Sequence, residues 1–342
     1  MAAPGTDPAP AGPASPVVAV TGATGFLGRH VITRLADAGV SVRALARPSL
    51  AADLAATETR PISWIAGRLH QHAALEQLLA GADGVIHLAG LVKALDRDGF
   101  FTVNATGSTA LFKVAAATNV RHVLLVSTLA AREPHLSAYG ASKRAAEQML
   151  EHPARAGLAA WPFGWTVVRP PAIYGPGDME ILTLFKAMRF GLLPAPGSRH
   201  NRFSMIHADD MAGALVALSL AGIADPASHQ HKVYEMDDGT PGGYGIHDVA
   251  GALAPHAPGG RRPRVVPVPG AVLQTLGLGG GLIGRLRGRP LTLDRDRGRF
   301  LAHPDWVVTK GRVPRLENWQ ARHTLVSGLA DTIAWYRDHG YL

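Results

Sequence analysis

The chain has 342 residues, which is enough for one large domain or two modest ones with a substantial core. Hydrophobic residues make up 47% and charged residues 18%, as in a typical globular enzyme, and the lack of cysteine excludes disulfides and thiolate metal sites. The net charge of +8 lies in residues 261–342, which contain 14 Lys and Arg and six Asp and Glu. This excess indicates a solvated basic surface or contact with an anionic ligand or membrane surface. No motif indicates a nucleic-acid partner.

The first segment, residues 1–16, is rich in Ala, Pro and Gly and lacks the basic start and apolar run of a signal peptide. We expect it to be a disordered leader. No stretch of the chain reaches the length of a transmembrane helix. We therefore expect a cytoplasmic protein, with peripheral membrane contact through the basic region as the alternative to a fully solvated surface.

Short apolar segments alternate with amphipathic ones through the first half of the chain. In chain order, we expect a strand at 17–20, a helix at 26–38, strands at 40–46 and 62–65, a helix around 75–79, a strand at 85–88, a helix at 103–117, a strand at 123–127, a helix at 138–151 and a strand at 166–169. This alternation predicts an α/β fold, a Rossmann-type doubly wound parallel sheet covered by helices on both faces.

Pro and Gly become frequent after residue 170. We expect a Rossmann core at 17–170 and a smaller substrate-binding lobe at 171–342, with a strand and helix at about 205–220 returning to the core and a last helix at 324–336. The glycines at 276–288 do not follow a strand, so they do not indicate a second nucleotide loop. Residues 268–289 fit either a packed helix and loop or an apolar cover over a lipid substrate.

A glycine-rich loop joins the first strand to the first helix. Gly22, Gly25 and Gly28 have the spacing G-x-x-G-x-x-G. The first glycine permits a tight turn, the second lets backbone approach a pyrophosphate, and the third lets helix and strand pack closely. The helix start adds amide donors and a favourable dipole, so the loop predicts a dinucleotide-binding site.

Tyr139 and Lys143 are four residues apart on a predicted helix and therefore share one face. We expect the Lys143 ammonium to lie near the phenol and to lower its pKa from the ordinary value near 10. Such a tyrosine can donate or accept a proton, as hydride-transfer chemistry requires. Ser127 and Thr128 end the preceding strand, and we expect one of these two hydroxyls to bind a substrate carbonyl.

Together these residues resemble the extended short-chain dehydrogenase/reductases of the NAD-dependent epimerase/dehydratase superfamily. The matching segments are TGATGFLG at 21–28, HLAG at 87–90, VSTLAA at 126–131, YGASK at 139–143 and RPPAIYGPGD at 169–178. The resemblance is strongest to dihydroflavonol-reductase-like and 3β-hydroxysteroid-dehydrogenase-like members. It implies an NAD(P)-dependent oxidoreductase in which Thr128 steadies a carbonyl, Tyr139 donates the proton and Lys143 holds the nicotinamide ribose. Homodimers are common in this superfamily.

The resemblance also implies where the cofactor binds. The implied cofactor-binding residues are Gly22, Thr24, Gly25, Phe26, Leu27, Gly28, Arg47, Arg68, Leu69, Ala89, Gly90, Lys143, Pro170 and Ile173. The second strand is followed by Arg47 with no acid nearby, which favours NADPH over NAD because an arginine accommodates the 2′-phosphate. Arg68 stands where many relatives have an adenine-binding Asp, so adenine binding must differ in detail.

Other polar residues are expected to be structural. The run Ile-His-Ala-Asp-Asp at 206–210 is expected to fix the junction of the two lobes, and Arg199 or Arg202 before it does not follow the epimerase pattern for gripping a diphosphate. The histidine pairs 70/72 and 229/231 have metal-compatible spacing, but no third ligand is evident and no metal is expected.

The segments 125–139 and 303–306 are similar to bacterial lipid-pathway reductases, among them the ketoreductases of ceramide synthesis. The expected reaction is the NADPH-dependent reduction of a ketone on a hydrophobic, lipid-like substrate, specifically a 3-oxo-sphingolipid. One alternative is a nucleotide-sugar epimerase or dehydratase that uses NAD. A second is a noncatalytic NADPH-binding accessory subunit.

Overall fold

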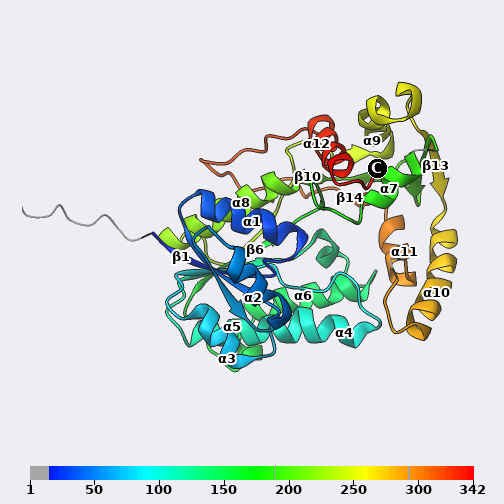
Figure 1. The fold of residues 1–342 in the computed structure, drawn as a ribbon. Coiled ribbons are helices and arrows are strands. Elements are labelled where there is room, and N and C mark those ends of the chain that lie inside the picture. The colour runs from blue at the N-terminus through cyan, green and yellow to red at the C-terminus, as the bar shows by residue number, and fades with distance from the viewer. Residues whose placement is uncertain (1–14, 189, 292) are drawn as a thin grey trace, which may run out of the picture.

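The computed structural model describes residues 15–188, 190–291 and 293–342, so the predicted leader lies almost wholly outside the described residues (Figure 1). Its centre is a seven-stranded sheet in the order β11-β6-β5-β4-β1-β2-β3, with every pair parallel. The strands are β1 (Val17–Thr21), β2 (Ser41–Ala46), β3 (Ile62–Ala66), β4 (Gly84–His87), β5 (His122–Val126), β6 (Gly164–Arg169) and β11 (Lys232–Glu235).

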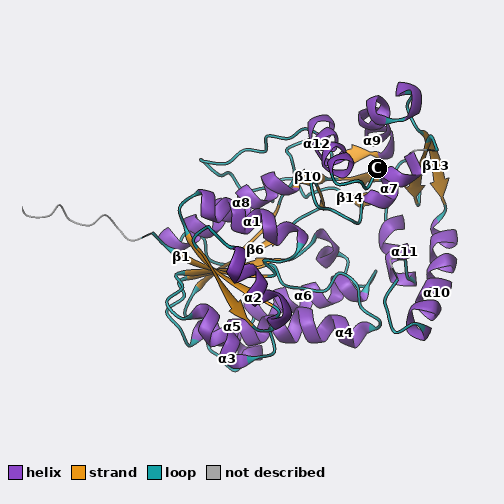
Figure 2. Cartoon of the chain, in the orientation of Figure 1, coloured by secondary structure: helices purple, strands orange, loops and turns teal. Residues whose placement is uncertain are grey.

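Helices cover both faces of this sheet (Figure 2). They are α1 (Phe26–Asp37), α2 (Pro48–Thr57), α3 (His72–Leu79), α4 (Arg97–Phe101), α5 (Ser108–Ala116), α6 (Ala138–Glu151) and α8 (Ala208–Ala224). Successive strand residues point to opposite faces: Val18 and Val20 enter the hydrophobic cluster under α1 and α8, whereas Ala19 enters the one under α3, α5 and α6. The predicted doubly wound α/β fold is therefore confirmed.

The rest of the chain forms a smaller lobe around a third hydrophobic cluster, which includes Phe185, Leu253 and Tyr336. Its strands are β7 (Ala172–Tyr174), β8 (Leu192–Pro196), β9 (Arg202–Phe203), β10 (Met205–His207), β12 (Tyr244–Gly245), β13 (Arg264–Val268) and β14 (Asp305–Trp306). Its helices are α7 (Leu182–Met188), α9 (Ile246–Leu253), α10 (Gly270–Leu286), α11 (Arg295–Ala302) and α12 (Leu325–Asp338). Among the described residues, no helix has the length and apolar character needed to cross a bilayer.

The described residues also form five short helical turns. They are the π-helix η1 (Thr102–Gly107) and the 3-10 helices η2 (Leu129–Arg132), η3 (Pro153–Ala156), η4 (Ala254–His256) and η5 (Pro258–Gly260). The π-helix joins α4 to α5 without a break, at the place where a single helix was expected. Local widening of this kind is often found at functional sites.

The run at 206–210 links three parts of the molecule. Asp209 accepts a hydrogen bond from Arg34 Nε of α1 at 2.7 Å. Asp210 Oδ2 accepts from the backbone N–H of His323 at 2.9 Å, and the Asp210 carbonyl accepts from Trp319 Nε1 at 2.9 Å. The first turn of α8 therefore fastens both α1 and the segment before α12.

Candidate active site

The predicted site residues lie at the carboxyl ends of the central strands. The chain builds β1, β2 and β3 outward in one direction and then returns to place β4 on the other side of β1. Parallel sheets bind ligands at such a reversal, because the loops that follow the two strands diverge and leave a crevice. The glycine loop follows β1, and Ala89 and Gly90 follow β4.

The glycine loop is packed tightly against the end of β4. Gly22 has a φ of +72°, and a Cβ there would lie 2.7 Å from the Ala89 nitrogen. A Cβ on Gly28 would lie 2.1 Å from the Gly22 carbonyl oxygen, so neither position accepts a side chain. Gly25 is the N-cap of α1, and no side chain caps this helix. The first-turn amides, including that of Phe26, thus remain suited to a pyrophosphate, and the loop fits a dinucleotide.

Other predicted cofactor-binding residues are held by contacts within the glycine loop and across the crevice. Thr24 accepts a hydrogen bond from Arg29 Nε through its carbonyl at 3.2 Å, and Leu27 packs against the hydrophobic cluster under α1 and α8. Across the crevice, Pro170 is buried and its carbonyl accepts from the Leu129 N–H at 2.9 Å. Ile173 pairs with Ile206 between β7 and β10.

Two arginines stand at the ends of neighbouring strands. Ala46 of β2 pairs with Ala66 of β3, and the exposed side chains of Arg47 and Arg68 follow these two residues. Arg43, in contrast, donates to the Leu78 carbonyl at 3.0 Å. Leu69 packs as a partly buried residue against the sheet. The two exposed guanidinium groups therefore lie at one edge of the crevice, where they suit a phosphate.

Helix α6 carries Tyr139 and Lys143 to this edge of the sheet. Its N-cap Ser137 accepts from the Gly140 N–H at 3.0 Å, which starts the helix one residue before Tyr139. Lys143 is only 5% exposed, and its Nζ donates to the Val126 carbonyl at the end of β5 at 2.6 Å. Burial lowers the pKa of Lys143 to about 8, and the Glu147 carboxylate opposes this shift.

The Tyr139 hydroxyl meets Thr128 and lies beside an aromatic wall. The Thr128 side chain lies near the phenol, and the Phe100 ring lies 6.1 Å from the Tyr139 ring. Burial raises the pKa of Tyr139, while the nearby Thr128 hydroxyl and the Arg297 charge oppose the rise. The expectation that Lys143 lowers this pKa is therefore wrong in this structure, because desolvation dominates and Lys143 donates to a backbone carbonyl instead. A raised pKa keeps the phenol protonated at neutral pH.

Ser127 and Thr128 have different partners. Ser127 Oγ donates to Glu147 Oε1 at 2.5 Å, and Glu147 is fully buried. Arg169 contributes two further hydrogen bonds to this carboxylate, at 2.9 and 2.6 Å. The Ser127 hydroxyl is thus committed to a buried ionic cluster, and of the two predicted hydroxyls only Thr128 faces the phenol.

Asn104 is a site residue that the sequence analysis missed. Its amide nitrogen donates to Ser142 Oγ at 2.9 Å and to the Leu91 carbonyl at 3.0 Å, and its oxygen accepts from the Leu91 N–H at 2.7 Å. This side chain, which lies on η1, ties the loop after β4 to α6. The sequence signal was an asparagine inside an apolar helical pattern. The structure shows this residue to be buried, and a buried amide needs hydrogen-bond partners.

His87 holds the base of the crevice. Thr21 Oγ1 lies 2.6 Å from His87 Nδ1, Ser108 Oγ lies 2.8 Å from Nε2, and Ser108 donates to the Asn104 carbonyl at 2.6 Å. A neutral His87 with its proton on Nε2 satisfies each of these groups. Burial, with the nearby Lys143 charge, lowers the pKa of His87 to about 3, so the ring stays neutral.

A pocket opens beside Tyr139, between α6 and the hairpin formed by α10 and α11. Its enclosed part holds about 30 Å³, room for a small polar group, and the rest of the hollow opens to solvent. The lining residues are Val92, Lys93, Phe100, Ser137, Tyr139, Leu291, Asp294, Asp296, Arg297 and Phe300. The Asp296 carboxylate also accepts from the Ala138 N–H at 2.9 Å, so α11 contacts the first turn of α6 directly. None of the residues after 290 in this lining was predicted.

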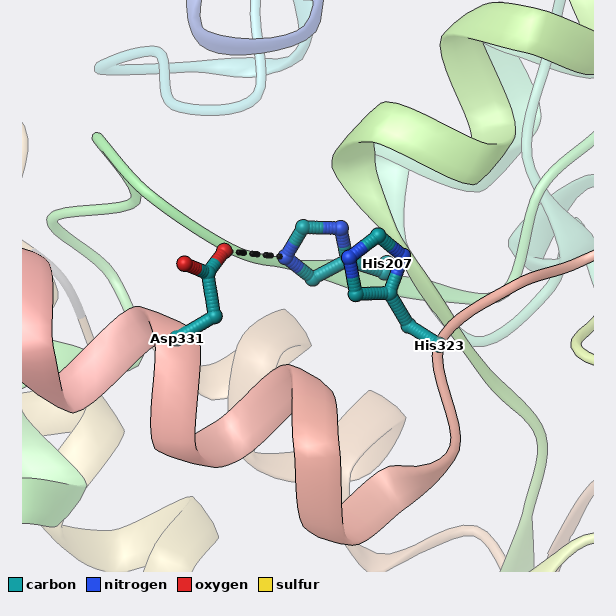
Figure 3. Close-up of side chains that lie close together, drawn as sticks. All are labelled: His207, His323 and Asp331. Carbon is teal, nitrogen blue, oxygen red and sulfur yellow. Dashed lines mark ion pairs between the residues drawn. The ribbon is translucent and has the colours of Figure 1, made fainter.

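A separate cluster joins His207, His323 and Asp331, with His207 between the other two (Figure 3). His207 Nε2 lies 3.3 Å from Asp331 Oδ2, and the two imidazole rings stack at 3.9 Å, 26° from parallel. A metal ion must lie near the plane of each ring, about 2.0–2.1 Å from its nitrogen. Planes so nearly parallel meet far beyond that distance, so both rings cannot bind one ion in this arrangement. Burial, with His323 nearby, lowers the pKa of His207 to about 4, and we interpret the cluster as a structural contact.

A family model described as the NAD dependent epimerase/dehydratase family matches residues 18–230. The chain belongs to this family. As an extended short-chain dehydrogenase/reductase of the epimerase/dehydratase family, the protein is an NAD(P)-dependent oxidoreductase. Thr128, Tyr139 and Lys143, the catalytic residues that the resemblance implies, lie together near the carboxyl end of β5.

Members of the epimerase/dehydratase family with different names resemble this chain. It is 37% identical over 327 residues to a protein of Caulobacter vibrioides named Ceramide reductase, covering 95% of this chain and 96% of that protein. It is 29% identical to 4-hydroxy-2-methyl-3-oxo-4-farnesyl-3,4-dihydroquinoline-1-oxide ketoreductase of Stigmatella aurantiaca, covering 65% and 68% of the two chains. The solved structure of MoeE5 with UDP-glucuronic acid and NAD shares 22% identity at a TM-score of 0.68, covering 95% and 100% of the two chains, which supports the fold alone.

The different partners of the two hydroxyls give a prediction. Thr128→Ala should lower kcat for cofactor-dependent turnover by about 10²-fold or more, as the loss of a preorganised donor does. Ser127→Ala should keep near-wild-type kcat but lower the free energy of unfolding by about 1–2 kcal/mol, since Glu147 loses a buried partner. Steady-state kinetics and chemical denaturation of both variants test this. Loss of turnover in Ser127→Ala alone would contradict the assignment.

Proposed function

We propose that this protein uses NADPH to reduce a ketone on a lipid-like substrate, specifically the 3-oxo group of a ceramide-like lipid. The observation that carries the proposal is that the Thr128 hydroxyl lies near the Tyr139 phenol, which lines a pocket with apolar walls. Lys143 lies one helical turn further along α6. The substrate carbonyl would enter the pocket and meet these two hydroxyls.

The residues of the chain divide the work of a carbonyl reduction. When bound, NADPH supplies the hydride that adds to the carbonyl carbon. Tyr139, kept protonated by the burial that raises its pKa, donates its proton to the carbonyl oxygen. Thr128 hydrogen-bonds to the same oxygen and orients it. Lys143, whose Nζ donates to the Val126 carbonyl, fixes α6 against β5 and so holds Tyr139 in position.

The pocket favours a neutral lipid over a nucleotide sugar. Phe100, Leu291 and Phe300 supply apolar walls, and the charges of Lys93 and Arg297 are balanced by those of Asp294 and Asp296. Such a lining suits hydroxyl and amide groups better than a diphosphate.

The arginine expected to serve a diphosphate in the alternative function is also engaged elsewhere. Arg202 Nη2 donates to the Gly242 and Gly243 carbonyls, at 2.9 and 2.7 Å. Neither Arg202 nor Arg199 lines the pocket beside Tyr139. This speaks against a nucleotide-sugar epimerase, while the complete set of Thr128, Tyr139 and Lys143 speaks against a noncatalytic subunit.

The similarity to Ceramide reductase extends over both lobes, because it covers 95% of the chain. It therefore includes the α10–α11 region that lines the pocket, and it supports a substrate of the same class. The Stigmatella aurantiaca relative, whose name describes a farnesyl-bearing ketone, supports a hydrophobic ketone more broadly.

Purified protein should consume NADPH with a 3-oxo-ceramide in detergent micelles and should leave UDP-glucose unchanged. Tyr139→Phe should lower kcat by about 10²–10⁴-fold, the contribution of a positioned proton donor. Tyr341→Phe is the matched control, since Tyr341 is 40% exposed near the carboxyl terminus and should keep wild-type turnover. Wild-type rates in Tyr139→Phe, or turnover of the nucleotide sugar with none of the keto-lipid, would refute the proposal.

Arg47 gives a separate prediction on the cofactor. If its guanidinium binds the 2′-phosphate, Arg47→Ala should raise KM for NADPH by about 10- to 100-fold, as loss of a charged hydrogen bond does, and leave KM for NADH unchanged. Arg155→Ala, which removes an exposed arginine that bonds Gln148, is the control. Equal effects of Arg47→Ala on both cofactors would show that the residue does not read the phosphate.

A further inference from the structure

The helix α10 packs against α11 largely through its glycines, with Leu273 as a buried large side chain beside them. A Cβ on Gly277 would lie 2.3 Å from the Asp294 carbonyl oxygen, and one on Gly280 would lie 2.2 Å from the Leu293 carbonyl oxygen. On the facing helix α11, a Cβ on Gly298 would lie 2.8 Å from the Leu273 carbonyl oxygen. The backbones of the two helices are therefore in close contact. Several bulky side chains of α10 lie on the faces of the helix that do not contact α11.

Four of these residues form an apolar stripe that faces solvent, which we call the α10 outer face. Val272, Leu276, Ile283 and Leu286 are 45%, 58%, 43% and 79% exposed. Their spacings of four, seven and three residues place them on one side of a helix with 3.6 residues per turn. Figure 1 shows α10 at the edge of the molecule, beside α11. Contiguous exposed apolar surface of this kind marks a contact with a partner.

Exposed arginines lie next to this stripe. Arg287 and Arg289 follow the end of α10, and Arg295 begins α11. In the part of the chain that the structure describes, none of the three forms an ion pair. An apolar face bordered by cations complements a bilayer that contains anionic lipids, because the side chains enter the interface while the arginines meet the headgroups.

The hairpin that carries the stripe also reaches the active-site pocket. The α10–α11 hairpin supplies Leu291 and Phe300 to the pocket lining, and Val92 from the loop after β4 lines the same pocket. Val92 is 56% exposed, and its neighbours Leu91 and Leu95 are 37% and 41% exposed. Exposed apolar residues thus lie near the pocket that contains Tyr139.

We propose that the α10 outer face, with Arg287 and Arg289, docks on an anionic bilayer and turns the pocket toward the lipid. This inference rests on the proposed function, because a ketone with two long chains resides in a membrane. The enclosed space beside Tyr139, about 30 Å³, has room for a small polar group such as the ketone but not for the two chains. The chains remain in the bilayer while the carbonyl reaches Thr128 and Tyr139.

The test is sedimentation of the full chain with large vesicles of phosphatidylcholine, either alone or with about 30% anionic phosphatidylglycerol. Wild type should bind the anionic vesicles more strongly. Leu276→Glu with Ile283→Glu should lower the partition coefficient by about tenfold or more, because two apolar side chains no longer enter the interface. Val313→Glu with Val326→Glu also replaces two exposed apolar side chains by carboxylates, but away from α10, and should bind like wild type.

A second pair of substitutions lies outside the helix and does not disturb its packing. Arg287→Ala with Arg289→Ala should lower binding to the anionic vesicles by about 10- to 30-fold and change binding to phosphatidylcholine little. Wild type that fails to bind either vesicle, or glutamate variants that bind like wild type, would overturn the proposal. A dimer in ultracentrifugation that the glutamates dissolve, without vesicle binding, would assign the face to a second copy of the chain.

Activity separates this proposal from the proposed function. The glutamate variant should reduce a short-chain, water-soluble 3-oxo amide at the wild-type rate and lose activity only on the long-chain keto-lipid in vesicles. Wild type that reduces neither substrate but still binds vesicles would refute the proposed function and leave the docking face standing. Equal loss on both substrates would mean that the glutamates damage the site, and would overturn the docking interpretation.

Discussion

The hydrogen bond from the buried Lys143 ammonium to the Val126 carbonyl is the contact on which the site depends. It fixes α6 against the end of β5, and therefore fixes Tyr139 beside Thr128. A buried charge is costly unless it is balanced. The Glu147 carboxylate, one further turn along α6, supplies part of that balance and is itself held by Arg169 and Ser127. The same few side chains thus stabilise the sheet edge and position the reacting groups.

The smaller lobe completes the site through one contact of the same kind. Asp296 of α11 accepts from the Ala138 N–H in the first turn of α6. A movement of the α10–α11 hairpin would therefore shift or break a contact of Ala138, the residue next to Tyr139. Because this hairpin also carries the exposed apolar stripe, a single element connects the surface that would meet the lipid to the residues that would reduce it.

Local patterns in the chain were sufficient for much of this structure. The strands of residues 17–169 and the α6 helix are short-range features, set by apolar runs and helical spacing, and they form within about two residues of the expected positions. The glycine loop was equally readable, because its function depends on consecutive residues between one strand and one helix. Arg47 could be placed for the same reason, since the end of a strand fixes its location.

Features that depend on residues distant in the sequence could not be predicted from local patterns. The choice between Ser127 and Thr128 depends on Glu147, and the raised pKa of Tyr139 depends on burial that only the folded chain creates. Asn104 acquires its role from Leu91 and Ser142. The edge strand β11 is only four residues long. A packed helix was one of the two interpretations of residues 268–289, and α10 confirms the helix, but the reason for its glycines lies in the facing backbone of α11.

The central proposal is that a bound nicotinamide would supply hydride to the carbonyl carbon of a lipid ketone while Tyr139 would protonate the oxygen. The most direct measurement uses NADPH carrying deuterium on the reactive face of C4, with the reduced lipid examined by mass spectrometry. The claim predicts one deuterium in the product, on the carbon that bears the new hydroxyl. A reduced lipid without deuterium, or no reduced lipid at all while a nucleotide sugar is epimerised, would contradict it.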